Sequence, residues 1–366
     1  MGKNDDLAHV IAEQINKLSG KQVAFFLADD PTAPTHFKDF ISTGSSILDI
    51  AVSNRKHGGI ACGRITELQG NEGSGKSLIA AHMLLDCQRR GGIAVLIDTE
   101  VAVNEDFFKA VGLDLSKAIY VSENLVENIF DIIEKIIESV RKTDSDKLVC
   151  IVVDSLSGAT TEREAESDHG QDGYATGKAI IISKALRKIT KLIGDQKIAL
   201  VFTSQLRQKM NAMPFADQWI TSGGKALGFH ASTRIRLTLA GTLKDPTTKE
   251  IIGVKVKAKV IKNRLGPPHR VAEFNILFSR GIDDYSSWYE TMKERKLIKS
   301  SGAWATWTDP KSGDEIRFQK GTFVELLLED KKRRGVIYNQ IADALIMTYE
   351  ETDIDILEVA EAPENI

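Results

Sequence analysis

The sequence lacks several features that mark whole classes of protein. No apolar run is long enough to span a bilayer, and the N-terminus has no basic segment followed by an apolar one, so we expect neither a membrane protein nor a secretory signal peptide. Its three cysteines, Cys62, Cys87 and Cys150, lie far apart in apolar surroundings. This spacing fits neither a metal site nor a disulfide framework, so we predict reduced core residues in a cytoplasmic protein.

The bulk composition is ordinary for a folded domain, with 366 residues, 42% of them hydrophobic and 27% charged. That length allows one large domain with appendages, or two domains. The net charge of −3 conceals an acidic end, because residues 349–366 hold seven Asp or Glu and no Lys or Arg. Such a tail is either a solvated end or a mobile segment that competes with a polyanion for a basic face.

The hydrophobic pattern predicts an α/β core that begins near residue 38. Helical stretches such as 124–141 and 179–193 separate short apolar runs of strand length, as expected for buried parallel strands with helices on both faces. These runs lie at 64–70, 93–100, 147–155 and 197–205. Three later runs, at 232–240, 253–263 and 270–279, have no long helix between them and predict antiparallel strands that extend the sheet.

Further segments flank this core. Residues 4–19 carry apolar side chains at three- and four-residue steps, which predicts an amphipathic helix that must dock on its own core or on another subunit. After the core the sequence becomes helical and basic, with a small Trp-containing unit. The predicted domains are an N-terminal helix and linker for subunit docking (1–37), the α/β core (38–286), a small C-terminal α+β domain (287–348) and an acidic tail (349–366).

The stretch GNEGSGKS matches the phosphate-binding pattern G-x-x-x-x-G-K-[ST]. It follows a strand and opens a helix, which is the context that separates a phosphate loop from a glycine-rich turn. Backbone N–H groups and the positive end of the helix would hold phosphates, Lys76 would reach the β- and γ-phosphates, and Ser77 would bind Mg²⁺. The loop comprises Gly70, Asn71, Glu72, Gly73, Ser74, Gly75, Lys76 and Ser77.

Acidic residues end two of the apolar runs. Asp154 is placed to help hold Mg²⁺, and Glu100 to activate a water molecule for attack on the γ-phosphate. The alternative for each is a helix cap at a strand–helix turn. From the residues alone, Asp98 remains an alternative to Glu100.

Several more motifs occur in one order around this site, namely FISTGSSILDIAV, IDTE, VVDS, SQLRQKM, SGGKALGFHASTRIRL and KVIKNRLGPP. With them the sequence resembles the RecA recombinase family over about 38–300. Several motifs in register are far more specific than one glycine loop. The C-terminal third resembles phage members of the family more than the common bacterial protein.

The resemblance implies a RecA-like P-loop core that forms a helical filament on single-stranded DNA, with ATP between neighbouring subunits. It implies that Glu100 is the catalytic glutamate and that Gln205 senses the γ-phosphate and passes its state to the DNA loop. It also implies that Lys262 and Arg264 reach the ATP of the adjacent subunit, as arginine fingers do. The family usually has lysine at both places, and Arg264 keeps the charge while altering the geometry.

The expected adenine contacts come from the same resemblance. Tyr285 matches an aromatic residue beside the adenine. Asn104 and Phe107 stand where the family has an Asp and a Tyr, and Val101 replaces a common His. The resemblance therefore supports phosphate binding more directly than adenine selectivity.

Two polar, glycine-bearing stretches, 164–178 and 206–225, predict loops on the face of the sheet that bind DNA. They offer cations for phosphates, backbone N–H groups, and apolar side chains that wedge between bases or stack on them. The alternative for the apolar side chains is a small hydrophobic cluster under a long loop. The candidates are Lys178, Lys184, Arg207, Lys209, Met210, Phe215, Trp219, Ser222, Gly223, Gly224 and Lys225.

We therefore expect a DNA-dependent ATPase of homologous recombination that uses ATP and Mg²⁺. Its expected partners are single-stranded DNA, homologous duplex DNA, further copies of the chain, and single-strand-binding and loader proteins. Two alternatives are a ring-forming helicase motor on the same core and a non-catalytic mediator that binds ATP and DNA. The Lys262–Arg264 pair argues against the first, and the presence of both Glu100 and Asp154 argues against the second.

Overall fold

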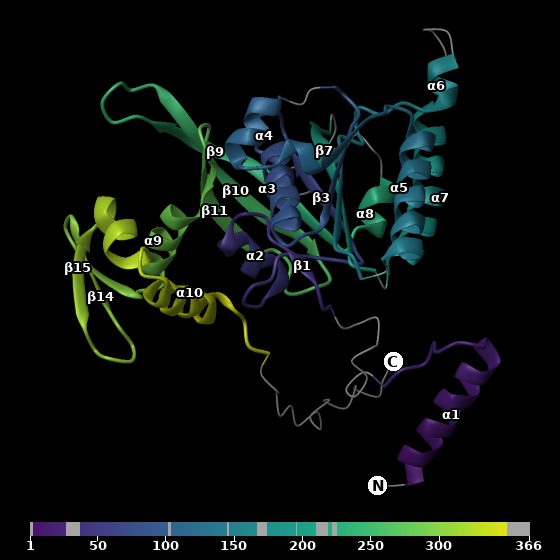
Figure 1. Cartoon of the computed structure of the whole chain (residues 1–366), viewed down its shortest axis with the longest axis horizontal. Helices are drawn as coiled ribbons and strands as arrows, with labels where there is room; N and C mark the ends of the chain where they lie inside the picture. The colour runs from purple at the N-terminus through teal and green to yellow at the C-terminus, as the bar shows by residue number, and fades with distance from the viewer. Residues whose placement is uncertain are drawn as a thin grey trace, which may run out of the picture.

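The centre of the molecule is a large, mostly parallel sheet with helices on both faces (Figure 1). The computed structural model describes residues 3–26, 37–101, 104–144, 146–166, 174–194, 196–209, 219–221 and 225–349. The predicted apolar runs form the middle of the sheet. Its parallel neighbours are, in order, β3 (Ile65–Gly70), β7 (Ile198–Gln208), β6 (Val149–Asp154), β4 (Ile93–Asp98) and β5 (Ala118–Ser122).

The side chains of these strands build two separate cores because they alternate between the faces of the sheet. Leu96 and Val152 pack on the side of α3 (Lys76–Arg89). Ile97 and Val153 pack on the opposite side, against α5 (Val126–Thr143) and α7 (Tyr174–Ile193). The prediction of an α/β sheet covered on both faces is confirmed.

The antiparallel extension is also confirmed. It consists of β9 (Thr233–Lys244), which runs parallel to β3, followed by the antiparallel strands β10 (Ile251–Asn263), β11 (Val271–Leu277) and β12 (Gly281–Asp283). On β10, Lys255, Lys257 and Lys259 are exposed and alternate with buried residues. Lys255 pairs with Glu273 of β11 at 2.7 Å. These lysines therefore share one face of the strand, as the two-residue period of a strand requires.

The C-terminal part is a three-stranded antiparallel sheet packed with helices. It contains α9 (Asp284–Glu294), β13 (Ile298–Ser301), β14 (Trp304–Thr308), β15 (Glu315–Gln319), η2 (Lys320–Thr322), η3 (Val324–Leu328) and α10 (Lys331–Leu345). Trp307 and Phe318 are fully buried and belong to the same hydrophobic cluster as α3. The proposed boundary between residues 286 and 287 lies inside α9.

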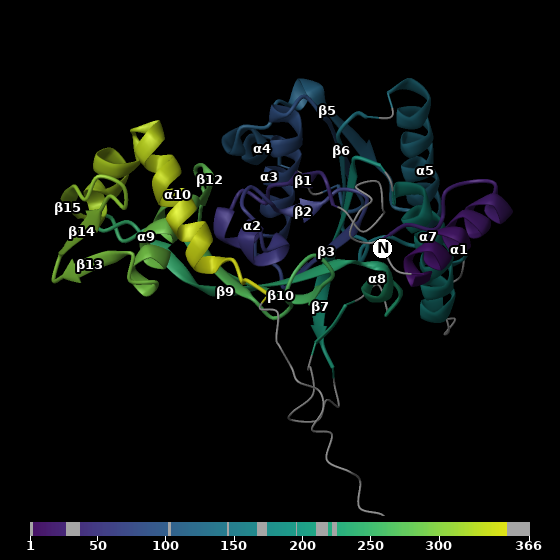
Figure 2. The ribbon, with the colours of Figure 1, turned by 90° about the horizontal axis from the view of Figure 1, so that it is seen from below.

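The N-terminal helix α1 (Lys3–Ser19) lies apart from the sheet (Figures 1 and 2). Its apolar side chains are exposed, and Leu18 is 91% accessible. The extended segment after it folds back, because the Asn16 side chain accepts from the backbone N–H groups of Val23 and Ala24 at 2.7 and 2.8 Å. The apolar stripe of α1 therefore stays exposed.

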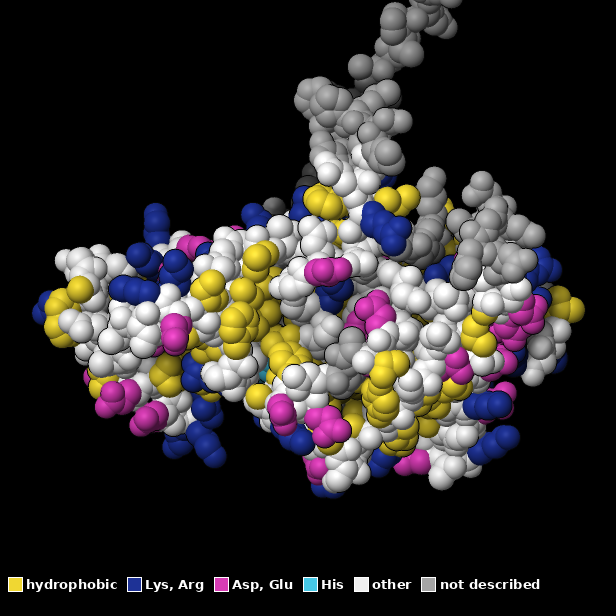
Figure 3. Space-filling view, turned by 90° about the horizontal axis from the view of Figure 1, so that it is seen from above, with side chains coloured by type: hydrophobic (Ala, Val, Ile, Leu, Met, Phe, Trp, Pro, Cys, Tyr) yellow, Lys and Arg dark blue, Asp and Glu magenta, His cyan; other side chains and the backbone are white. Residues whose placement is uncertain are grey.

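The parallel strands end at the edge of the sheet from which α4 (Glu105–Val111) and α6 (Glu162–Glu166) emerge, at the top of Figure 1. Seen from that edge, basic, acidic and hydrophobic side chains lie side by side (Figure 3). The remaining short elements are β1 (Phe40–Ile41), α2 (Ser46–Ser53), β2 (Ile60–Ala61), η1 (Leu115–Lys117), β8 (Trp219–Thr221) and α8 (Lys225–His230).

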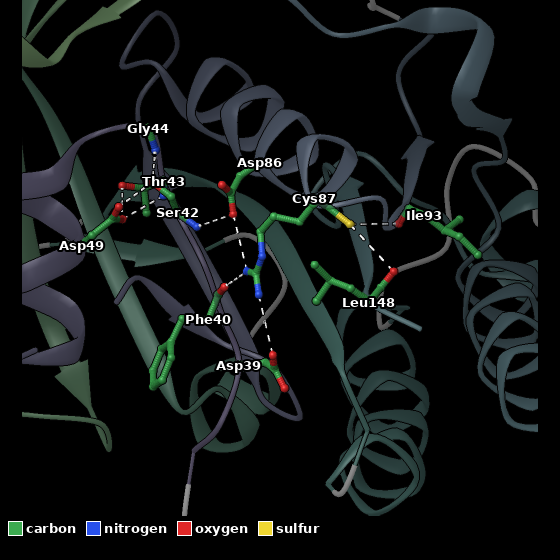
Figure 4. Close-up of polar contacts among 11 residues, drawn as sticks. Asp39, Phe40, Ser42, Thr43, Gly44, Asp49, Asp86, Cys87, Ile93 and Leu148 are labelled. Atoms are coloured by element: carbon green, nitrogen blue, oxygen red, sulfur yellow. Dashed lines mark hydrogen bonds and ion pairs between the residues drawn. The ribbon is translucent and has the colours of Figure 1, made fainter. Parts of the chain in front are cut away.

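A polar network ties the start of the core to α3 (Figure 4). The Asp86 carboxylate accepts from the backbone N–H of Ser42 at 3.1 Å, and the Arg90 side chain donates to the Phe40 carbonyl. Close by, the Cys87 thiol donates to the carbonyl of Ile93 at 3.3 Å. All three cysteines are buried and free, so their prediction as core residues is confirmed. Among the described helices, none is both long and apolar enough to cross a membrane.

Candidate functional site

The glycine loop joins β3 to α3 at the edge where the parallel strands end. Gly73 and Gly75 have φ angles of +69° and +93°, a region that favours glycine. Ser74 is buried, and its hydroxyl donates to the Asn71 carbonyl at 2.7 Å. Gly75 precedes α3 as its N-cap residue and makes no side-chain cap hydrogen bond. The first N–H groups of the helix are therefore left for an anion.

Lys76 is the first residue of α3, and its side chain reaches back to the start of the loop. Its amine donates to the carbonyls of Gly70 and Asn71 at 3.0 and 2.9 Å. Burial lowers the pKa of Lys76, while the negative charges of Asp154, Glu100 and Glu72 oppose that shift. The fold thus brings the lysine and the two strand-end acids together, although they come from three separate stretches of sequence.

Oxygen donors beside the lysine fit a magnesium ion. Asp154 accepts from the Thr203 hydroxyl of β7, and the Ser77 side chain is exposed in the first turn of α3. In the described ranges no cluster of three or more His, Cys, Asp or Glu forms a dedicated metal cage. Mg²⁺ is commonly held by one or two protein oxygens together with substrate phosphates, so this donor set suits it.

The structure distinguishes Glu100 from Asp98, the alternative candidate for the acid that activates a water molecule. Asp98 is buried and accepts from the Tyr120 hydroxyl at 3.1 Å and from the Glu100 backbone N–H at 3.0 Å. Glu100 is exposed, and its carboxylate accepts from the Ser155 hydroxyl at 3.0 Å. Of the two acids, Glu100 is therefore the one accessible to a water molecule.

Gln205 connects the phosphate loop to the second predicted DNA stretch. It lies opposite Gly70 in the ladder between β3 and β7. Its side-chain amide donates to the Glu72 carboxylate at 2.7 Å, and its backbone N–H donates to the Ser157 hydroxyl at 3.0 Å. Through Gln205 the glycine loop therefore contacts β7 directly, and β7 leads into residues 206–225.

Lys262 lies away from the loop of its own chain. It is opposite Arg234 of β9, which in turn is opposite Glu67 of β3. Glu67 precedes Gly70 by three residues, about 10 Å along a strand, and two strand spacings separate β10 from β3. The Lys262 backbone therefore lies well away from the glycine loop of its own chain.

The Lys262 amine donates to the carbonyls of Gly228 and Phe229 in α8 at 2.8 and 2.9 Å. Burial lowers its pKa, and the positive charges of Arg264 and Arg234 add to that shift. Arg264 is exposed. The Lys262 amine thus lies against α8 and not at the glycine loop. Burial lowers the pKa of His230 in α8, and the positive charge of Arg264 adds to that shift, so Arg264 also lies near α8.

The predicted adenine contacts have local roles. The Asn104 side chain caps α4 by accepting from the N–H groups of Asp106 and Phe107 at 2.9 and 3.4 Å. Phe107 is half-buried against the core cluster that includes α3. The Tyr285 hydroxyl accepts from Arg334 at 3.4 Å. The adenine roles of Asn104, Phe107 and Tyr285 stay predictions.

The first DNA stretch is less loop-like than predicted. Helix α6 covers 162–166 and α7 begins at Tyr174, so the prediction of a loop over all of 164–178 was wrong at both ends. The helix predicted for 179–193 extends towards its N-terminus because adding a turn to an existing helix is cooperative. Lys178 lies in α7 and donates to the Ala159 carbonyl, and burial lowers its pKa. Lys184 is exposed further along α7.

The ends of the second stretch form an antiparallel ladder. Arg207 lies opposite Ile220, and Gln208 opposite Trp219. The prediction of a loop throughout 206–225 was wrong there, because the two arms pair their backbone groups as strands. Arg207 and Lys209 are exposed. Met210, Phe215, Ser222, Gly223, Gly224 and the Lys225 side chain lie outside the described residues.

Sequence reasoning missed the hydroxyl groups that hold the functional side chains. Ser155 and Ser157 follow β6, and Thr203 lies in β7, and each contacts a predicted site residue. For Ser155 and Ser157 the position after a strand end was the only signal available, because serine is common at such turns. Thr203 lies within β7, where the sequence carried no such signal.

An α/β sheet with this glycine loop and these strand-end acids defines a P-loop nucleotide-binding protein. The RecA N-terminal domain family matches residues 6–283. The Protein RecA of Helicobacter pylori strain Shi470 is 34% identical over 333 residues, covering 91% of this chain and 90% of the relative. That of Sulfurimonas denitrificans is 34% identical over 357 residues, covering 96% and 97%. The chain belongs to the RecA family of recombinases.

Proposed function

We propose that this chain couples ATP hydrolysis to binding of single-stranded DNA and catalyses homologous pairing and strand exchange from a helical filament. Membership of the RecA family carries ATP-dependent recombination and DNA repair, and disfavours the helicase and mediator alternatives. The proposed coupling between the nucleotide site and DNA is supported by one hydrogen bond, which the Gln205 side-chain amide donates to the Glu72 carboxylate at 2.7 Å. It joins the phosphate loop to the strand that enters the DNA stretch.

In the proposed reaction the loop 70–77 binds the phosphates through its backbone N–H groups, and Lys76 moves from its carbonyl partners to the β- and γ-phosphates. Ser77 and Asp154 would hold Mg²⁺, which neutralises phosphate charge when bound. Glu100 takes the proton of the attacking water, and its bond from Ser155 keeps the carboxylate oriented.

The reaction site is completed by a second copy of the chain. Lys262 and Arg264 lie on a face distant from their own loop, so the proposed partner is the nucleotide of the adjacent subunit. There the two cations stabilise the charge on the γ-phosphoryl group during transfer to water. Asn104, Phe107 and Tyr285 are proposed to contact the adenine.

Coupling to DNA follows from competition for Gln205. A γ-phosphate is a charged acceptor, as the exposed Glu72 carboxylate is, so the two would compete for the Gln205 amide. Transfer of this bond would reposition the end of β7, where Arg207 and Lys209 begin the DNA stretch. The remaining proposed DNA contacts are Lys178, Lys184, Met210, Phe215, Ser222, Gly223, Gly224 and Lys225.

The proposed partners are single-stranded and homologous duplex DNA, with single-strand-binding and loader proteins as helpers in the cytoplasm. The exposed lysines of β10 are proposed to contact the incoming duplex. Sequence recognition in this scheme comes from base pairing and not from side-chain readout.

The test measures ATP turnover with and without single-stranded DNA, followed by a joint-molecule assay. We expect DNA to stimulate turnover and joint molecules to form. Stimulated turnover with duplex unwinding and no joint molecules would favour the helicase motor. Binding of ATP and DNA without turnover would favour the mediator.

A further inference from the structure

His82 lies on α3, the helix that begins with Lys76 at the glycine loop, and it contacts segments that are distant in the sequence. Its Nε2 atom accepts from the Ile282 backbone N–H of β12 at 3.0 Å. His82 follows Lys76 by six residues, which is about 9 Å along the helix axis. None of the proposed steps of ATP hydrolysis uses this histidine.

The His82 ring is held between two glycine residues. Gly44 precedes α2 with a φ of +86°, and Gly281 begins β12 with a φ of +84°. A Cβ atom on Gly44 would lie 2.7 Å from the ring, and one on Gly281 would lie 2.4 Å from Nε2. Because packed atoms do not approach so closely, a larger residue at either position would displace the ring. The ring therefore holds α3 against both segments.

The ring acts as an uncharged hydrogen-bond acceptor. Since Nε2 accepts from a backbone N–H, the proton of the neutral ring is on Nδ1. Burial lowers the pKa of His82 to about 4, and the positive charge of Arg89 adds to that shift. The ring therefore stays an acceptor near neutral pH. β12 ends the strand order of the described sheet, and His82 gives its backbone a side-chain acceptor in place of a further strand.

The two elements that carry the proposed aromatic contacts to adenine meet beside His82. β12 leads directly into α9, which carries Tyr285. Gly281 also approaches α4, because a Cβ atom there would lie 3.4 Å from the Val111 side chain. Helix α4 carries Phe107 and packs against α3 (Figure 1). The placement of both elements relative to the glycine loop therefore depends on the contacts of His82.

We propose that His82 is a positioning residue for the base of the nucleotide. Its bond to Ile282 and its packing against the two glycines hold Tyr285 at a fixed distance from the loop that binds the phosphates. The proposal rests on the proposed function, because it requires that Tyr285 contact the adenine. A ligand that joins a base to a triphosphate gains from both subsites only when they are correctly spaced before it binds. His82 therefore acts on the affinity for ATP and not on the chemical step.

The experiment compares His82→Leu, which removes the acceptor, with His82→Gln, whose amide oxygen can take the position of Nε2. Dissociation constants are measured by calorimetry with Mg²⁺ for a non-hydrolysable ATP analogue and for inorganic triphosphate, which has no base. We expect His82→Leu to bind the ATP analogue about 10-fold more weakly, as loss of one hydrogen bond predicts, and triphosphate within about 2-fold of wild type. His82→Gln should bind both within about 3-fold of wild type.

Turnover separates positioning of the base from a general loss of structure. The KM of His82→Leu for ATP should rise about 10-fold, while kcat stays within about 2-fold of wild type. The matched control is Gln88→Leu on the same helix. Gln88 also binds backbone outside α3, because its side chain donates to the Asp114 carbonyl at 2.8 Å and accepts from the Asp114 N–H at 3.0 Å. This control should keep both affinities within about 2-fold of wild type.

If His82→Leu does not fold, His82→Asn replaces it, because its shorter side chain cannot reach Ile282. Equal losses for the ATP analogue and for triphosphate, or no loss for either, would overturn the proposal. So would a His82→Gln variant that binds the ATP analogue no better than His82→Leu does. If wild type bound the ATP analogue no more tightly than triphosphate, the adenine contacts of the proposed function would be refuted, and the role of His82 with them.

Discussion

Asp49 is a buried carboxyl group in α2, and we expect it to make the free energy of unfolding depend on pH. Its oxygens accept from the Thr43 backbone N–H at 2.8 Å and from the Thr43 and Ser42 hydroxyls (Figure 4). Burial raises the pKa of Asp49 from 3.8 to about 7, although these bonds oppose the shift, and the nearby charge of Asp284 adds to it. Burial also raises the pKa of Asp284 to about 6. The nearby Tyr338 has its pKa raised by burial and by both carboxylates.

The direction of the pH dependence follows from which state of the protein, folded or unfolded, binds the proton of Asp49 more tightly. Between pH 4 and pH 7 the folded Asp49 keeps its proton while the unfolded chain has released it. The contribution of Asp49 to the free energy of unfolding is therefore complete when the pH is below the pKa of the unfolded state. It is lost as the pH rises through the pKa of the folded state. With a pKa of 3.8 unfolded and about 7 folded, the loss between pH 5 and pH 8 is about 2.5 kcal/mol.

The perturbation is Asp49→Asn, which keeps the shape and does not titrate. The free energy of unfolding is measured by denaturant titration at pH 5 and pH 8 for wild type, the variant and the control Asp131→Asn, an exposed carboxyl on α5. We expect the difference between wild type and Asp49→Asn to change by about 2.5 kcal/mol over this range, and the control to change by less than about 0.5 kcal/mol. An identical pH dependence in wild type and Asp49→Asn would refute the reasoning.

Three further predictions concern the site and the tail. The variants Glu100→Gln and Lys262→Ala, each assayed alone, should lose at least about 100-fold in ATP turnover. An equal mixture of the two should regain about one quarter of wild-type turnover. In random assembly, about one shared site in four has an intact Glu100 from one subunit and an intact Lys262 from its neighbour. No recovery on mixing would contradict a site shared between subunits. The variant Lys76→Ala should abolish binding of a fluorescent ATP analogue and, with it, binding of single-stranded DNA. If the variant still bound single-stranded DNA, the proposed coupling between nucleotide and DNA binding would be contradicted. Deleting 349–366 should strengthen duplex binding at low salt, and an affinity unchanged across a salt titration would remove that role of the tail.

Much of the fold follows from contiguous residues. The apolar runs of β4 and β6 and the glycine pattern at 70–77 are local, so their strand and phosphate-loop conformations were predictable. The acids Glu100 and Asp154 were predictable as neighbours because parallel strands end at one edge of the sheet. The ladder at Arg207 was missed because its alternation is short and interrupted by residues typical of loops.

The α/β order, the phosphate loop and the acids at its rim each depend on residues adjacent in the chain, so they can be predicted from the sequence. The contact of Gln205 with Glu72 across 133 residues, and the exposure of Glu100 rather than Asp98, arise from the packing of distant segments. These outcomes depend on which strands become neighbours in the sheet. The strand order is set by packing on both faces of the sheet, and no local sequence pattern encodes it.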